Sequence, residues 1–199
     1  MRKILLSSFL ALVIGGAAEA SVSPYAAVRL GVNQLNGDFS DDFFGPSNMH
    51  QTNGWLGQVA AGAAFQANDW VGLRGELSYE FSRANRVGDG STNLNDNRVL
   101  ASVFVDFGGR NWGGFNPFIG LHGGYTFGTL HSPVGHEEAK GQTYGASIGV
   151  SYAIDSSMTV DFTVRHLMTD RDGHDAQFSE NFRMSNNETS ALLGLRLSF

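Results

Sequence analysis

The chain has 199 residues, no cysteine and a formal net charge of -6, with 26 glycines and 4 prolines. This length suits one domain, and the lack of cysteine excludes a disulfide framework and thiolate metal sites. The acidic charge argues against nucleic acid as a partner, because phosphate contacts need a basic surface.

The first twenty residues have the pattern of a secretory signal peptide. Arg2 and Lys3 open the chain, a mostly apolar run follows, and an A-x-A pattern at 18–20 ends the segment. These are the three parts of a cleavable signal, and the run is too short for a transmembrane helix. We therefore expect residues 1–20 to be removed by cleavage after Ala20, leaving one domain over residues 21–199.

The remaining chain has no apolar stretch near the ~20 residues that a membrane helix needs, so only a β-barrel would let it span a membrane. Apolar and polar residues instead alternate with a period of two, which predicts strands with one apolar face. In the third strand, for example, Leu73, Leu77 and Tyr79 share one face. In chain order the predicted strands lie near 25–33, 55–66, 71–82, 98–107, 119–127, 143–152, 158–168 and 190–199.

Charge separates the two faces of these strands. No charged residue lies on an apolar face, whereas the polar faces carry five arginines and four carboxylates. The alternative is a soluble sandwich or lipocalin-like barrel, but five arginines and four carboxylates are ill suited to the core of such a protein, where unpaired charge is very costly. In a membrane barrel the polar face lines the interior and the apolar face meets lipid. The nine residues are Arg29, Arg74, Glu76, Glu80, Arg98, Asp106, Asp161, Arg165 and Arg196.

Aromatic residues and connection lengths agree with an all-β, eight-stranded antiparallel transmembrane barrel whose N- and C-termini are periplasmic. In this topology the aromatic residues of the strands gather in two bands, one near each membrane boundary. Short turns at 67–69 and 155–157 alternate with long links, as in outer-membrane barrels, and a glycine-rich link at 108–116 is the exception. The links expected to be long external loops are 36–52, 83–96, 130–140 and 170–187.

Four segments resemble the opacity-protein/porin-like family of small outer-membrane β-barrels: SPYAAVRLG at 23–31, VGLRGELSYEF at 71–81, NPFIGLHGG at 116–124 and the terminal LGLRLSF. The resemblance implies an eight-stranded barrel in outer-membrane lipid and lipopolysaccharide. It also implies that the barrel-assembly machinery reads the last strand through Leu195, Leu197 and the terminal Phe199. It implies no single activity, because the family includes adhesins and structural proteins.

The nine inward charges form the first candidate site. Eight strands enclose an interior just wide enough for side chains to fill, so we expect these charges to pair as a polar plug. The near balance of five arginines and four carboxylates favours such a network. The alternative is a narrow porin-like path lined by charge.

The positions of the histidines and carboxylates give little support for an enzyme site or a metal site. His131, His136, Glu137 and Glu138 lie together in the third link, but their spacing matches no known metal motif. His166 is the one histidine predicted to face outward. Lipid A deacylases use a histidine and a serine two residues apart, whereas here Met168 occupies that second position. We therefore expect no enzyme activity, no metal and no cofactor, with a lipid-modifying enzyme as a remote alternative.

The first and fourth links combine acidic and aromatic residues, the kinds that contact a partner. Since function in a membrane barrel resides in its exposed connections, we expect a surface protein with a structural or adhesin-like, partner-binding role and no open solute pore. The partner would be an extracellular protein. The candidate contact residues are Asp38, Phe39, Asp41, Asp42, Phe43, Phe44, Phe178 and Phe182.

Overall fold

The structure is a computed structural model that describes residues 22–41, 45–87, 92–108, 114–132, 135–175 and 180–199. The predicted signal peptide at 1–20 lies outside these residues. Within the described part, no helix is long and apolar enough to cross a membrane.

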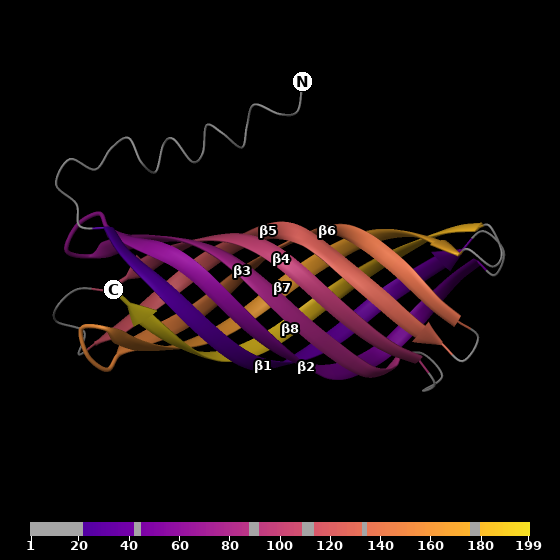
Figure 1. Ribbon diagram of the computed structural model, residues 1–199, viewed down its shortest axis with the longest axis horizontal. Coiled ribbons are helices and arrows are strands. Elements are labelled where there is room, and N and C mark those ends of the chain that lie inside the picture. The colour runs from indigo at the N-terminus through magenta and orange to yellow at the C-terminus, as the bar shows by residue number, and fades with distance from the viewer. Residues whose placement is uncertain (1–21, 42–44, 88–91, 109–113, 133–134, 176–179) are drawn as a thin grey trace, which may run out of the picture.

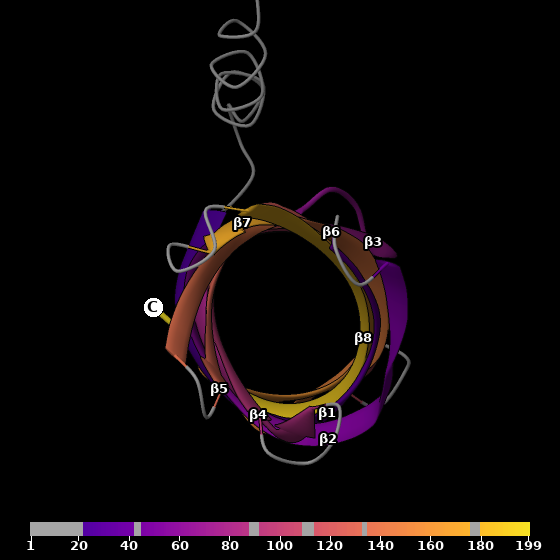
Figure 2. The same ribbon diagram turned by 90° about the vertical axis from the view of Figure 1, so that its right-hand side faces the viewer.

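Eight strands form one closed antiparallel barrel (Figure 1). Each strand pairs with the next in the chain, and the last pairs with the first, so that Figure 2 shows a continuous ring. This confirms the predicted all-β, eight-stranded fold. The strands are β1 (Val22–Asp41), β2 (Gly45–Gln66), β3 (Val71–Val87), β4 (Thr92–Phe107), β5 (Phe115–Ser132), β6 (Gly135–Ala153), β7 (Met158–Asp175) and β8 (Glu180–Ser198).

The barrel has two different ends. The turn end holds the start of β1, the end of β8 and the links from β2 to β3, from β4 to β5 and from β6 to β7. The opposite end, called the far end here, holds the other four links. The strands are 16 to 22 residues long, whereas a strand needs only ~9–11 residues to cross a bilayer. The barrel is therefore much longer than a membrane is thick.

The far-end links are much shorter than the sequence indicated, and this corrects the prediction. Residues 36–52, for example, were expected to be a loop, but β1 and β2 stay paired as far as Asp41 and Gly45. The alternation disappears there because, beyond the apolar zone, neither face of a strand has to be apolar. The other three predicted loops, 83–96, 130–140 and 170–187, likewise consist largely of paired strand.

The turns at the two predicted short links are built alike. The Asn68 Oδ1 atom accepts hydrogen bonds from the backbone N–H groups of Trp70 and Val71, both at 2.9 Å. The Asp155 carboxylate accepts from the N–H groups of Ser157 at 2.7 Å and Met158 at 2.8 Å. These bonds, the Ser157 N–H first, hold the pKa of the exposed Asp155 carboxyl below its usual range. Side chains that accept from a following backbone are the expected turn chemistry.

Outward-facing side chains form an apolar surface bordered by aromatic residues. Leu30 and Leu121, which face outward in its middle, are each 69% exposed. On the far side, Trp55 packs edge-on against Phe81, with ring centroids 5.5 Å apart. At the turn end the exposed aromatic residues include two that were not predicted, Trp70 and Phe115. Most aromatic residues of the two predicted bands are exposed. On the far side these are Trp55, Tyr79, Phe81, Tyr125, Phe127 and Tyr144, and at the turn end they are Phe107, Tyr152 and Phe199.

Inside the barrel, large side chains lie directly opposite glycines. An added Cβ at Gly124 would lie 2.9 Å from a methyl carbon of Leu100 and 2.0 Å from the Val99 carbonyl oxygen. Small barrels fill their interiors by alternating large and small residues in this way, which accounts for part of the high glycine content. The direct cross-strand pairs are Tyr25–Gly62, Arg29–Gly194, Leu100–Gly124, Phe104–Gly120, Phe118–Gly149, Leu167–Gly145 and Leu192–Gly31.

Two adjacent glycines allow this packing to be tested. Gly124 faces the filled interior, whereas a Cβ at Gly123 would meet nothing within 4 Å. We expect Gly124→Ala to fold poorly into lipid vesicles and to lose about 1–3 kcal/mol of unfolding free energy, because the interior is overpacked. Gly123→Ala should behave like the parent. Folding is measured by the gel-mobility difference between folded and heated barrel, and equal yields for the two variants would contradict the packing.

Candidate functional site

All nine predicted interior charges point into the barrel. Seven of them are buried, and Asp106 and Arg196, close to the turn end, are half-buried. Glu80 is 0% exposed and Arg98 is 1% exposed. The predicted inside and outside faces of the strands are therefore confirmed.

Three further buried charges complete the set: Asp96, Arg171 and Glu188. Asp96 and Arg171 lie in segments that were expected to be loops, and Glu188 lies between the fourth of these segments and the predicted last strand. Continuing the period-two alternation would have found them, because Asp96 lies two residues before Arg98 and Arg171 lies six after Arg165. With these three, the described interior contains six arginines and six carboxylates, so its formal charge is balanced.

Six of these residues form a tight group toward the far end, the far ionic cluster: Glu80, Asp96, Arg98, Arg165, Arg171 and Glu188. Glu80 accepts hydrogen bonds from Arg98 at 2.9 Å and from Arg165 at 2.6 Å. The two terminal nitrogens of Arg171 bind the two oxygens of Asp96 at 2.8 and 2.6 Å, and Arg98 also bonds to Glu188. Glu80 and Arg98 are neighbours on β3 and β4. Because β3 and β4 lie across the ring from β7 and β8, the other bonds connect opposite walls of the barrel.

The other six charges form the near ionic cluster: Arg29, Arg74, Glu76, Asp106, Asp161 and Arg196. Arg29 makes two parallel hydrogen bonds of 2.7 Å to Glu76, a strong bidentate geometry. Asp161 is different, because it lies between 3.5 and 4.0 Å from three guanidinium groups. Neither of its carboxylate oxygens has a hydrogen-bond partner among the described residues. This cluster is therefore the looser of the two.

Neutral residues fill the middle of the barrel. His122 lies between two hydroxyl groups, with its ring nitrogens 2.8 Å from Ser102 Oγ and 2.8 Å from Ser147 Oγ. The cavity beside it measures only about 10 Å³, space for about one water molecule. Six buried apolar side chains were not predicted, because each lies on the face of its strand that the alternation indicates to be polar. They are Leu56, Leu100, Phe104, Phe118, Leu167 and Leu192.

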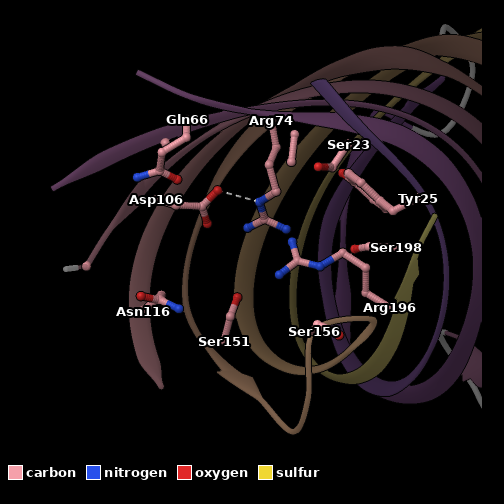
Figure 3. A pocket seen from close by; sticks show the side chains of 13 residues that line it. Ser23, Tyr25, Gln66, Arg74, Asp106, Asn116, Ser151, Ser156, Arg196 and Ser198 are labelled. Atoms are coloured by element: carbon pink, nitrogen blue, oxygen red, sulfur yellow. Dashed lines mark hydrogen bonds and ion pairs between the residues drawn. The ribbon is translucent and has the colours of Figure 1, made fainter. Parts of the chain in front are cut away.

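A larger cavity, of about 280 Å³, lies inside the turn end (Figure 3). Its wall includes Tyr25, Arg74, Asp106 and Arg196. Arg74 bonds through Nε to Asp106 at 2.6 Å, and its guanidinium lies 4.6 and 4.8 Å from the centres of the Phe104 and Phe118 rings. This cavity is large enough to hold a small solute, unlike the cavity beside His122.

On the outer surface, His166 is exposed, as predicted, but it has a neighbour that the sequence did not indicate. Its Nδ1 atom lies 3.0 Å from the Thr189 hydroxyl on β8. The sequence pattern considered only hydroxyl groups on the same strand as His166, so it could not indicate a hydroxyl on the neighbouring strand. No described carboxylate hydrogen-bonds to this imidazole, and no three described His, Asp or Glu side chains are grouped to hold a metal ion. The side chains of His131, His136, Glu137 and Glu138 lie outside the described part.

The candidate contact residues divide into two groups. Asp38, Phe39, Asp41 and Phe182 belong to strands rather than loops, although their side chains are not among those described. Barrel closure brings the two predicted links together, since Asp41 pairs with Phe182 and Asp38 with Ser185. The other four predicted contacts, Asp42, Phe43, Phe44 and Phe178, lie outside the described residues.

The predicted assembly signal lies on the outer face of the last strand. Leu197 and Phe199 are exposed, Phe199 at 79%, and Leu195 is half-buried. The Phe199 N–H donates to the Pro24 carbonyl at 3.0 Å, which extends the β1–β8 ladder to the end of the chain. Recognition of these residues by the assembly machinery stays a prediction.

The fold and the charged interior are those of an outer-membrane barrel. Residues 6–196 match the family described as outer membrane protein beta-barrel domain. Since this match covers nearly the whole chain, the protein belongs to that family. No curated protein matches the sequence.

Solved structures with the same fold are only distantly similar in sequence. Neisserial surface protein A (NspA) is 20% identical, with 87% of this chain and 99% of that chain covered and a TM-score of 0.51. The outer membrane protein OprG from Pseudomonas aeruginosa is 12% identical, with 89% and 96% covered and a TM-score of 0.56. Outer membrane protein AlkL is 12% identical, with 89% and 90% covered and a TM-score of 0.54. At these identities the likeness extends to the fold alone.

The far ionic cluster predicts a large effect for a small substitution. Glu80→Gln keeps the shape of the side chain but leaves Arg98 and Arg165 with one carboxylate fewer between them. Removing one partner of a buried ion pair costs roughly 3–5 kcal/mol, so unfolding in urea should need markedly less denaturant. The exposed Asp69→Asn is the control and should change stability by less than about 0.5 kcal/mol. Similar midpoints for both variants would show that the cluster contributes little.

Proposed function

We propose that the protein is exported with a signal peptide cleaved after Ala20 and spans the outer membrane with its turn end and both termini in the periplasm. Its far end then stands outside the cell and presents a rigid β-sheet surface to an extracellular protein partner. In this proposal the protein is neither an open solute pore nor an enzyme. The observation that carries the proposal is the long paired extension of the strands beyond the outer aromatic band.

The extension is large enough to form a binding surface. In β2, ten residues from Gly45 to Gly54 precede Trp55 of the outer aromatic band, which corresponds to about 30 Å along the strand. The ladder connects β1 to β2 on one side and to β8 on the other. Asp38, Phe39, Asp41 and Phe182 therefore belong to one continuous sheet.

The filled interior supports a closed barrel. Ion paths need charges that are free to interact with the passing ion. Here six arginines face six carboxylates among the described residues, and the middle of the barrel holds a cavity of only about 10 Å³.

Lipid-modifying chemistry has weaker support. His166 contacts the Thr189 hydroxyl, but no described carboxylate orients the imidazole, as an activated nucleophile requires.

Conductance measurements test the closed barrel. Purified protein reconstituted in planar bilayers should give no large, steady current in salt solution, because the paired charges and apolar side chains fill the interior. A stable pore that passes sugars would rule out the proposal of a closed barrel. A porin reconstituted in the same lipid is the positive control.

Shortening the extension tests the partner-binding role. Leu35 and Thr52 are paired across β1 and β2, so replacing residues 36–51 with an Asn-Gly turn keeps the register and the membrane-spanning part. Bacteria that express this variant should lose attachment to cultured epithelial cells or to immobilised matrix proteins. The parent should attach.

A matched control shortens a different part of the far end. Gly128 and Ala139 are paired across β5 and β6, and the same turn placed between them leaves β1, β2 and β8 untouched. This control should still attach. If the parent itself does not attach, while cells lacking it become sensitive to detergent, the protein has the structural role instead.

A further inference from the structure

The cavity inside the turn end has the composition of an anion site. Seven of the eight strands contribute to its wall, and six polar residues of that wall are Gln66, Arg74, Asp106, Asn116, Ser151 and Arg196. Its volume of about 280 Å³ is close to the lower end of small-molecule sites, which begin near ~300 Å³. It reaches the rim of the barrel, where Ser156 of the β6–β7 turn lines it.

Arg74 directs unused donors into this cavity. The side chain is buried, with 3% of the residue exposed, and its Nε atom is bonded to Asp106. Its two terminal nitrogens, Nη1 and Nη2, have no hydrogen-bond partner among the described residues. The flanking rings of Phe104 and Phe118 hold the guanidinium in place. Leaving a buried donor without a partner is unfavourable, and more so when the donor is charged, which makes a bound acceptor favourable.

Arg196 reaches into the same space from β8. Figure 3 shows its guanidinium and that of Arg74 pointing toward each other across the cavity. Its Nη1 atom has no hydrogen-bond partner among the described residues, and neither has the Ser151 hydroxyl on the same wall. Its Nη2 atom lies 3.5 Å from Asp161. Two guanidinium groups and a hydroxyl thus face a common volume.

In the far ionic cluster the terminal arginine nitrogens are used differently. There, both terminal nitrogens of Arg98 and of Arg171 are hydrogen-bonded to carboxylates. In the cavity wall, two arginines face a single lining carboxylate, Asp106, whose bond is to the Arg74 Nε. Asp161 lies behind the wall, 4.0 Å from Arg74 Nη1 and 3.5 Å from Arg196 Nη2, but it hydrogen-bonds to neither. Three terminal arginine nitrogens, Nη1 and Nη2 of Arg74 and Nη1 of Arg196, therefore remain to donate.

We propose that this cavity binds a small oxyanion, a carboxylate or phosphate group, between Arg74 and Arg196. Guanidinium groups match the planar, two-oxygen geometry of these anions, and charge-assisted bonds of this kind are the strongest hydrogen bonds in proteins. The Ser151 hydroxyl supplies a further donor. The source of the anion rests on the proposed function: with the turn end in the periplasm, the anion enters the cavity from the periplasm.

Titration of the purified, folded protein in detergent micelles tests the site. Inorganic phosphate and acetate are titrated separately by calorimetry, at constant ionic strength set with chloride. We expect one saturable site per chain. Saturation by phosphate alone assigns the site to phosphate groups, saturation by acetate alone assigns it to carboxylates, and the absence of saturation by either anion would overturn the proposal.

Three variants locate the binding. Arg196→Gln should weaken the affinity by about tenfold or more, since it removes a charge-assisted donor, and Ser151→Ala provides a milder change if the arginine variant folds poorly. The matched control is Arg83→Gln, which removes one arginine from an exposed position on β3 and should stay within about twofold of the parent. An equal loss in the control, or no loss in both cavity variants, would overturn the site. Because the micelle experiment does not depend on which end faces the periplasm, its result is independent of the proposed orientation and partner.

Discussion

The structure depends on one constraint, which is that a strand inside a hydrocarbon layer must hydrogen-bond all of its backbone polar groups. Pairing of β8 with β1 meets it by removing both edges of the sheet, and the ladder continues to the terminal residue, where Phe199 donates to Pro24. Once eight strands close, side chains alternate strictly between lipid and a narrow interior. Everything that faces inward must then fit a bore of fixed width, which explains why Leu100 lies opposite Gly124.

The same narrow interior accounts for the charge balance. A buried guanidinium without a carboxylate would be very costly, so six arginines accompany six carboxylates among the described residues. The two clusters nevertheless differ in quality. In the far cluster, Arg171 holds Asp96 through two short bonds, whereas in the near cluster Asp161 touches three arginines at longer range. The far cluster ties opposite walls together, and the near cluster leaves donors directed into a cavity.

The two ends of the barrel thus differ in structure. The turn end has compact turns based on Asn68 and Asp155 and a cavity lined by Arg74 and Arg196. At the far end, paired strands extend beyond the outer aromatic band and join β1, β2 and β8 in one surface. The family defines the fold, and the proposed partner-binding and anion-binding roles rest on these two features, which belong to this chain's own residues.

Local alternation was sufficient to determine the strand count, the inside and outside faces, nine interior charges and the turns at Asn68 and Asp155. These features depend on residues close together in the chain and on a difference in solvent between the two faces of a strand. Beyond the apolar zone that difference vanishes, so the pattern could not show that β1 continues to Asp41, nor that Asp96, Arg171 and Glu188 face inward. Contacts between strands, such as His166 with Thr189 or Arg98 with Glu188 across the bore, depend on register and closure. Only the tertiary structure decides these, because no local pattern records which residue of another strand arrives opposite.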